Sequence, residues 1–467
     1  MNNNKKLATN IMLMFLVYFL PKIMSFFLVP VYTNCLTTEE YGISDLILGT
    51  ASLIAPFISL ATPNAILRFT IENKTDRRPY QVGIRIYVRG MIILLVLMGL
   101  VSLFLRINPI YIACTYMVVG FSVLADIYLS YARGLETMKI VTFCGVASAF
   151  VSIICNILFI VVFKWGIYGF IFASMAGYIF DIVVLAIYNR KKCLLKGITR
   201  VERAFTNDML HFSVPLIFSG ISWWVVSSSD RYFVSWMCGS AANGVYAVAY
   251  KIPVILQSLD NVFGQAWLYT LYDSYKTDDG RNYIAKVFDA YNFLFCLGCS
   301  FLIIIDLFLS KLLFANEFFT AWKYVPFLLL SVVFNSASGL MGNFLSIYKK
   351  TRIAMNISIL AAGINLILNY LLIFLLKDAM GAAIATAITF MVSCYCTIKV
   401  SVKVSGVSIN VRKQMLVYLI LLTQSITIVM TQNIYITSVG FLLIILINWR
   451  TIMWAKNKWK NLIRIKK

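Results

Sequence analysis

The chain has 467 residues, of which 61% are hydrophobic and 13% charged, and its formal net charge is +22. Soluble domains carry about a quarter charged residues, so this composition excludes a soluble globular protein and predicts an all-α membrane protein. The cations lie in short clusters between apolar runs and form no basic domain or nucleic-acid-binding motif, so we expect no nucleic acid partner.

Apolar runs of spanning length recur along the whole chain, and about twenty apolar residues cross a bilayer as a helix. Outer-membrane strands alternate over about ten residues and do not give such runs. We predict fourteen transmembrane helices, near residues 9–32, 43–63, 84–105, 109–131, 141–163, 166–188, 209–236, 241–263, 287–309, 320–347, 352–375, 379–401, 413–431 and 433–453.

Lysine and arginine gather on one side of this predicted topology. With both ends placed inside, 32 of the 41 cations lie in inner loops or termini and only five lie in outer loops. Cytoplasmic loops of membrane proteins carry an excess of these residues. The pattern predicts a multi-pass plasma-membrane protein with both termini in the cytoplasm.

Three pairs of similar segments indicate an internal duplication. Residues 41–46 and 61–69 are similar to residues 243–248 and 263–271 at a constant offset of 202, and residues 156–164 are similar to residues 369–377. Six helices therefore recur as helices seven to twelve. Because six is even, the two copies have the same orientation and are related by an axis along the membrane normal.

The duplication predicts how the chain is organised. We expect an N-terminal lobe at residues 1–200 and a C-terminal lobe at residues 201–408, arranged around a central cavity. Residues 409–467 would add two accessory helices, the thirteenth and fourteenth, and a basic tail. The loops leave no room for a further domain, so function must reside in the helix bundle.

Four cations fall within predicted spans, where a charge costs at least roughly 2.5 kcal/mol. They are Lys22, Arg89, Arg231 and Lys251. Lysine and arginine both bind phosphate, so we interpret these side chains as ligands of an anionic substrate group. The alternative is that each pairs with a neighbouring carboxylate, as Asp230 next to Arg231 could, or extends to the membrane surface.

Polar residues also form stripes on two of these helices. In the first helix, Tyr18, Lys22 and Ser25 lie beside Pro21; in the helix at residues 241–263, Tyr246, Tyr250, Gln257 and Asn261 follow one face and Gln265 continues it. Such stripes face protein or a water-filled cavity. We therefore predict a hydrated cavity, with Tyr18, Tyr250, Gln257 and Asn261 among the substrate-binding residues.

Four carboxylates are candidates for carrying a coupling proton or sodium ion. Asp126, Asp181, Asp260 and Asp289 lie in apolar runs. A carboxylate in a low dielectric can change its protonation as access to the cavity changes. The alternative is a structural role, and Asp289 is close enough to a cytoplasmic end to be interfacial.

Other motifs have structural interpretations. Cysteine pairs at 296/299 and 394/396 have metal-like spacing but no nearby histidine, so we read them as small buried side chains and predict no metal site. We expect Gly169 and Gly381 to allow close helix packing, and we expect four asparagines to bond between helices: Asn156, Asn356, Asn365 and Asn369. No nucleotide-binding loop or catalytic triad occurs, so we predict no cofactor and no enzymatic activity.

Four stretches carry a family resemblance. They are residues 10–34, the Thr-Thr-Glu-Glu-Tyr-Gly sequence at 37–42, the Ser-Asp-Arg-Tyr-Phe sequence at 229–233, and residues 244–251. Together with the fourteen-span length, they resemble the bacterial polysaccharide-biosynthesis flippases of the O-antigen and capsule type. These belong to the multidrug, oligosaccharidyl-lipid and polysaccharide exporter (MOP) superfamily.

The resemblance implies a V-shaped bundle of two six-helix lobes with a cationic cavity in the bacterial inner membrane. It implies that an undecaprenyl-pyrophosphate-linked oligosaccharide moves from the inner to the outer leaflet by alternating access, coupled to a proton or sodium ion. Partners would be membrane lipids and the glycosyltransferases and polymerase of the same pathway. Alternatives are a lipid II flippase, a multidrug antiporter of the same superfamily, or a membrane-embedded polysaccharide polymerase, which would need larger outer loops.

Overall fold

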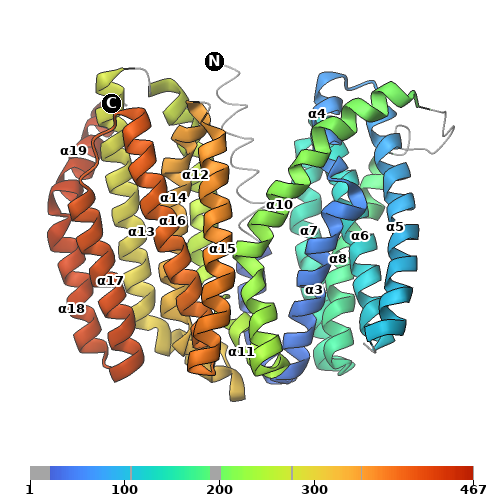
Figure 1. The fold of residues 1–467 in the computed structure, drawn as a ribbon, viewed down its shortest axis with the longest axis horizontal. Helices are drawn as coiled ribbons and strands as arrows, with labels where there is room; N and C mark the ends of the chain where they lie inside the picture. Colours follow the sequence, from blue (N-terminus) through green and yellow to red (C-terminus); the bar gives the residue numbers. More distant parts are fainter. Residues whose placement is uncertain (1–20, 106–107, 190–200, 275–276, 349, 466–467) are drawn as a thin grey trace. The chain divides into compact units, whose positions relative to one another are not determined.

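A computed structural model describes residues 21–105, 108–189, 201–274, 277–348 and 350–465. These residues are helical nearly throughout and contain no strand, which confirms the predicted all-α class. The chain divides into two compact units, Met1–Ser228 and Ser229–Lys467, with the boundary inside one long helix (Figure 1).

The first unit is organised around one central helix. Its elements are α2 (Val29–Cys35), α3 (Thr38–Ser59), α4 (Thr62–Glu72), α5 (Arg78–Leu105), α6 (Pro109–Gly134), α7 (Met138–Asn156), the π-helix η1 (Ile157–Val162), α8 (Gly166–Tyr188) and the first part of α10 (Arg203–Cys238). Helix α6 packs against α3, α4, α5, α7 and α8. Its Val119 and Ile127 are fully buried in the core of this unit.

The second unit is also organised around one central helix. Its elements are the end of α10, α11 (Ser240–Ala249), α12 (Pro253–Ser274), α13 (Asp278–Leu313), the 3-10 helix η2 (Asn316–Lys323), α14 (Val325–Ile347), α15 (Thr351–Leu376), α16 (Met380–Ser405), α17 (Val411–Thr431), α18 (Ile434–Ile447) and α19 (Trp449–Ile465). Helix α14 packs against α12, α13, α15, α16 and α17. Its apolar segment is 78% buried.

Each unit repeats the packing of the other. Helix α6 contacts α4, α5 and α8, and α7 contacts α8; likewise α14 contacts α12, α13 and α16, and α15 contacts α16. In both units a lysine in the left-handed conformation follows the repeated segment, with φ 55° at Lys164 and 52° at Lys377. The duplication inferred from sequence is therefore visible in the internal packing of each unit.

Eleven helices among the described residues are long and apolar enough to cross a membrane, and the α18–α19 pair is a twelfth if it counts as one span. These correspond to twelve of the fourteen predicted spans. The predicted span at 9–32 lies largely outside the described residues. The other difference is at residues 241–263.

The prediction of one continuous helix at residues 241–263 is wrong. The chain forms α11 and α12 instead, and residues 250–252 are turns between them. Pro253 explains the break, since proline has no N–H to donate and its ring clashes with the carbonyl four residues earlier in a helix. The final predicted span also differs, because α18 ends at Ile447 and α19 continues at 55° to it.

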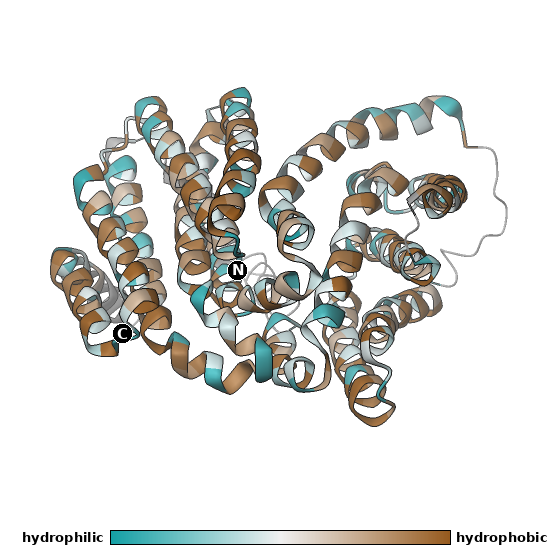
Figure 2. Ribbon diagram, turned by 60° about the horizontal axis from the view of Figure 1, so that its bottom comes forward, coloured by the Kyte–Doolittle hydropathy of each residue, from teal (hydrophilic) through white to brown (hydrophobic). Residues whose placement is uncertain are grey.

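The outer surfaces of the helices suit a lipid environment. In α5 the large side chains from Ile92 to Phe104 are mostly exposed, with Leu103 at 79% and Phe104 at 81%. An exposed apolar surface of this extent marks contact with a membrane or a partner. Figure 2 shows hydrophobic residues running along most of each helix, with hydrophilic residues gathered near many helix ends.

Close helix packing at two glycines is confirmed. A methyl group on Gly169 would lie 3.1 Å from the backbone of Phe159, and one on Gly381 would lie 2.5 Å from the backbone nitrogen of Ile373. Of the predicted interhelical asparagines, Asn365 accepts from Ser229 of α10 at 3.2 Å and donates to Thr389 of α16.

The other three asparagines behave differently from the prediction. Asn156 donates to the Ser152 carbonyl within α7, and Asn369 donates to Asn365 within α15. Asn356 is exposed. These hydrogen bonds satisfy the amide donors of Asn156 and Asn369 inside single helices, while their side-chain oxygens have no hydrogen-bond partner among the described residues.

Candidate functional site

The break between α11 and α12 places a lysine inside an otherwise apolar helix pair. At the break the Lys251 N–H donates to the Val248 carbonyl at 2.9 Å, and Val254 donates to the Tyr250 carbonyl at 3.1 Å. Helical hydrogen bonding resumes after Pro253. Lys251 is half-buried there.

A buried carboxylate holds α10 and α11 together beside this break. Asp230, which is 1% exposed, accepts hydrogen bonds from the hydroxyls of Tyr246 at 2.7 Å and Tyr250 at 2.5 Å. Its other oxygen accepts from the backbone N–H of Arg231 at 2.9 Å, and the Arg231 guanidinium lies 5.1 Å from the centre of the Tyr250 ring. Asp230 thus positions two predicted substrate residues, Arg231 and Tyr250.

Sequence reasoning assigned Asp230 only a possible pairing with Arg231. The structure gives it two tyrosine partners, the fully buried Tyr246 on α11 and Tyr250 in the turn that follows α11. The signal was present, because a carboxylate in an apolar run needs donors and the following helix supplies two tyrosines four residues apart.

The remaining residues of the predicted stripe lie on α12. Gln257 is half-buried and Asn261 is exposed. They are four residues apart, so they share one face of α12. The helix break separates this face from Tyr250, so the stripe is carried by two helices and not by one.

Two predicted ion-coupling carboxylates of the second unit belong to hydrogen-bond networks. Asp260 of α12 accepts from Ser336 of α14 at 2.5 Å and also from the Tyr291 hydroxyl of α13. Asp289 of α13 accepts from Gln414 of α17 at 2.7 Å and lies 3.6 Å from the Lys413 ammonium. Asp260 therefore joins three helices, and Asp289 lies in an ion pair.

A third carboxylate of this unit was not predicted. Asp306 of α13 is fully buried; one oxygen accepts from Ser310 at 3.1 Å, and the other has no hydrogen-bond partner among the described residues. Its sequence signal is a single aspartate within a long apolar run, the same signal that identified Asp260 and Asp289.

The predicted substrate-binding and ion-coupling residues of the first unit do not lie together. Lys22 is half-buried in the helical residues 21–27, and Tyr18 lies outside the described residues. Asp181 of α8 is 6% exposed and one of its oxygens has no hydrogen-bond partner among the described residues. Asp126 of α6 is exposed.

Arg89 lines a basic pocket of about 490 Å³ in the first unit. Arg85, one turn away on α5, and Arg203 at the start of α10 line the same pocket, and no carboxylate among the described residues does. Three guanidinium groups around one space form a site that suits a phosphate group. Sequence analysis predicted Arg89 alone.

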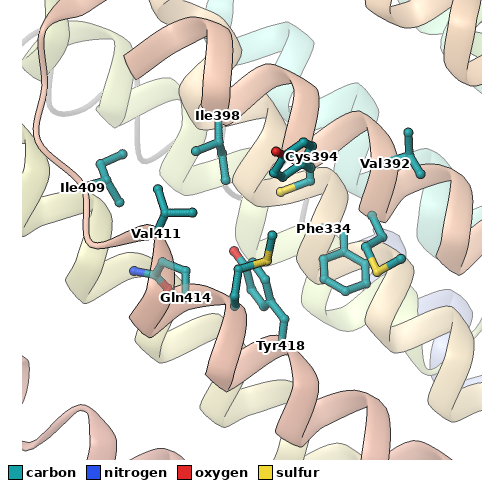
Figure 3. A pocket seen from close by; sticks show the side chains of 11 residues that line it. Phe334, Val392, Cys394, Ile398, Ile409, Val411, Gln414 and Tyr418 are labelled. Carbon is teal, nitrogen blue, oxygen red and sulfur yellow. The ribbon is translucent and has the colours of Figure 1, made fainter. Parts of the chain in front are cut away.

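The second unit also contains an apolar pocket of about 240 Å³ (Figure 3). Phe334 of α14, Ile398 of α16 and Val411 of α17 contribute to its wall, and Gln414 and Tyr418 are among its few polar residues. Such a lining fits a hydrocarbon chain and not a glycan or a phosphate.

Known proteins place the chain in a family. A family model described as "Polysaccharide biosynthesis protein" matches residues 7–269, which is more than half of the chain. An uncharacterised membrane protein of Methanocaldococcus jannaschii is 24% identical over 241 residues, or 46% of this chain and 56% of that protein. The chain thus matches little more than half the length of this relative.

Solved structures share the fold at low identity. The inward closed conformation of the lipid II flippase MurJ superposes with a TM-score of 0.65 at 14% identity, covering 96% of this chain and 98% of that chain. An inward-facing multidrug resistance MATE family transporter of the MOP superfamily gives 0.60 at 13% identity, covering 83% and 95%. A MOP superfamily transporter from Pyrococcus furiosus gives 0.54 at 14%, covering 85% and 96%.

These likenesses confirm the resemblance at the level of family and fold. Identities of 13–14% establish the fold alone, whereas the family model covers most of the first half of the chain and continues past Lys251. The protein therefore belongs to the polysaccharide biosynthesis protein family and has the fold of the MOP-superfamily transporters.

Proposed function

We propose that the protein is a lipid-linked oligosaccharide flippase that moves an undecaprenyl-pyrophosphate-linked glycan from the inner to the outer leaflet by alternating access. The supporting observation is Lys251, a half-buried cation at a break in an apolar helix pair of a polysaccharide-biosynthesis family member. Broken helices near mid-membrane often supply substrate sites in transporters, because their free backbone groups and charges can face a cavity.

The charge balance favours an anionic cargo. Lys22 and Lys251 are half-buried in segments in which apolar residues predominate. A pyrophosphate offers several negative oxygens to such cations and would offset the cost of holding them in the membrane. In this proposal Lys22 and Lys251 bind the pyrophosphate, while the polyprenyl chain stays in lipid.

Other residues take supporting roles in the same proposal. Arg231, held beside Asp230 and Tyr250, is a further phosphate ligand. The basic pocket of Arg85, Arg89 and Arg203 would receive the pyrophosphate at the inner end of the first unit. Tyr18, Gln257 and Asn261 would bind the sugars.

The coupling ion would be bound by aspartates. We propose Asp126, Asp181, Asp260 and Asp289 as candidates and add Asp306, whose fully buried side chain has one oxygen unpaired among the described residues. A buried carboxylate without a cationic partner favours its neutral form and can release a proton when water reaches it. Both termini would lie in the cytoplasm of a bacterial cell.

Lipid II is a second candidate cargo, favoured by the similarity to MurJ over 96% of the chain. Both cargoes carry undecaprenyl pyrophosphate, so the cationic site does not distinguish them. A comparison of the translocation rates of the two lipids by the same protein preparation distinguishes the two cargoes.

The test is translocation by the full-length protein in liposomes. A fluorescent undecaprenyl-pyrophosphate-linked oligosaccharide and labelled lipid II are supplied separately, and the fraction that becomes accessible to a quencher is followed with time. We expect faster translocation of the oligosaccharide lipid than in protein-free liposomes, and loss of at least tenfold in rate for Lys251→Ala and for Lys22→Ala.

The matched control is Lys139→Ala, which removes an exposed cation in the first turn of α7. It should translocate as the unchanged protein does. Wild-type rates for both Lys22→Ala and Lys251→Ala, at equal reconstitution, would refute the cationic clamp, and faster transfer of lipid II would select that cargo instead.

A further inference from the structure

A second basic pocket lies where α13, α17 and the α18–α19 bend meet. It has a volume of about 610 Å³ and is lined by Lys286 and Asp289 of α13, Lys413 of α17, and Trp449, Arg450 and Trp454 of α19. None of these residues except Asp289 was singled out from sequence. The substrate proposal does not use the pocket.

The pocket carries a net positive charge that its own carboxylate does not balance. Asp289 is the one acidic residue among three cations in the lining. Lys413 is already placed, because its ammonium donates to Thr451 at 2.8 Å and lies 3.6 Å from Asp289. Gln414 donates to the other Asp289 oxygen.

Two cations are left to bind an external anion. Lys286 and Arg450 are exposed, and neither side chain has a hydrogen bond or ion pair with any residue that the structure describes. They approach the pocket from different helices, so one anionic group between them would bridge α13 and α19. A phosphate diester fits this arrangement, since its two free oxygens can each accept from one cation.

The surroundings of the pocket indicate a lipid. Leu446 and Ile447 form part of its wall at the end of α18, and Leu446 is 66% exposed. Trp449 is 57% exposed at the point where the chain bends by 55°. Tryptophan and basic residues mark the headgroup level of a bilayer, and apolar side chains just beyond them contact acyl chains.

The geometry points to a binding site for the phosphate of an anionic phospholipid of the cytoplasmic leaflet, with Lys286 and Arg450 as its ligands and Lys413 as the fixed cation between them. The acyl chains would pass over Leu446 along the exposed face of α18. The inner-leaflet assignment follows from the clustering of the chain's cations at this end of the helices.

The experiment is native mass spectrometry of the full-length protein with added phosphatidylglycerol or phosphatidylcholine. The unchanged protein should retain phosphatidylglycerol preferentially. Each cation near a membrane surface contributes a factor of about five to binding of anionic lipid, so Lys286→Gln/Arg450→Gln should weaken retention of phosphatidylglycerol about 25-fold. The charge-conserving Lys286→Arg/Arg450→Lys variant should restore it.

The control is Lys139→Gln/Arg352→Gln, which removes two exposed cations that we also predict on the inner side, at the starts of α7 and α15. It should bind as the unchanged protein does. Equal retention of the two lipids by the unchanged protein, or an equal loss in the control, would overturn the site. Glycerol phosphate that competes as strongly as phosphatidylglycerol would overturn its assignment to a lipid.

Discussion

The two copies of the duplicated helix pair, α3–α4 and α11–α12, begin and end at equivalent positions but break at different ones. Thr38 and Ser240 start the pairs, and Glu72 and Ser274 end them, each at the offset of 202 residues. The first pair breaks after Ser59, where Leu60 and Ala61 are left-handed with φ of 47° and 51°. The second breaks at residues 250–252.

Proline position accounts for the difference. Pro63 lies in the first turn of α4 and Pro253 begins α12. Proline is tolerated in the first turn of a helix and disfavours a helix that continues from before it, and α3 ends within one turn of its internal Pro56. Each proline therefore sets where its second helix starts.

The shifted break changes what lies at the equivalent position. Lys251 corresponds to Gly49 at the offset of 202, and Gly49 sits within the continuous helix α3, where its carbonyl accepts from the Trp224 indole at 3.1 Å. The scaffold of the two copies is repeated, but the cation is not. A duplicated bundle can thus acquire an asymmetric binding site through one proline and one lysine.

The largest loss of stability should come from substituting the glycines that make equivalent close contacts in the two copies. Gly381→Ala puts a methyl group 2.5 Å from the backbone of α15, and we expect a loss of about 3 kcal/mol in unfolding free energy, because backbone cannot yield as a side chain does. Gly169→Ala, with contacts at 3.1 Å, should cost about 1 kcal/mol. Thermal unfolding in detergent measures both, and the reverse order would contradict the packing described.

The next largest loss of stability should appear only in the second copy. Asp230→Ala leaves the buried hydroxyls of Tyr246 and Tyr250 without their acceptor and should cost about 2 kcal/mol. The position equivalent to Tyr246 is Ser44, which donates to the Glu40 carbonyl of its own helix, so Ser44→Ala should cost less than about 1 kcal/mol. Unfolding by denaturant compares the variants, and equal losses would show that Asp230 is not the junction of α10 and α11.

Removing the proline should make the second copy more like the first. Pro253→Ala restores an N–H that allows α11 to continue into α12 and would turn Lys251 away from its present position. We expect translocation to fall about tenfold, which corresponds to about 1.4 kcal/mol, with little change in thermal stability. Pro63→Ala is the matched control in the first copy. An equal loss of translocation in Pro63→Ala would show that the effect of the proline does not depend on the position of Lys251.

The smallest effect concerns the position equivalent to Lys251. Trp224→Phe removes the indole donor to the Gly49 carbonyl and to Ser52, at 3.1 and 3.2 Å. The hydrogen bonds are partly exposed, so the unfolding free energy should fall by about 0.5–1 kcal/mol. Thermal unfolding checks this, and a loss as large as that of Asp230→Ala would mean that the first copy depends on this contact as strongly as the second depends on Asp230.

Much of the fold could be predicted from sequence because its causes are local or repeated. Apolar runs of spanning length gave most of the helices, and the similar segments gave the pairs that pack alike. The break before Pro253 was missed because hydropathy stays high across it, although the proline itself was visible. The bend after Ile447 was missed for the same reason.

The site was harder to predict because its residues meet only in three dimensions. Lys22, Arg231 and Lys251 stand out as charges in apolar runs, and so does Asp306, which was not among the residues predicted from sequence. By contrast, the pocket of Lys286 and Arg450 unites residues more than 160 positions apart. Neither side chain is unusual in its own segment, since each lies among other cations near a helix end.

The most direct test of the central claim is the affinity of the full-length protein in detergent for undecaprenyl pyrophosphate compared with undecaprenol, measured by fluorescence-detected binding. We expect a strong preference for the pyrophosphate that disappears in Lys22→Gln/Lys251→Gln and persists in Lys139→Gln/Arg352→Gln. An unchanged preference in the first double variant would contradict the role assigned to the two half-buried lysines.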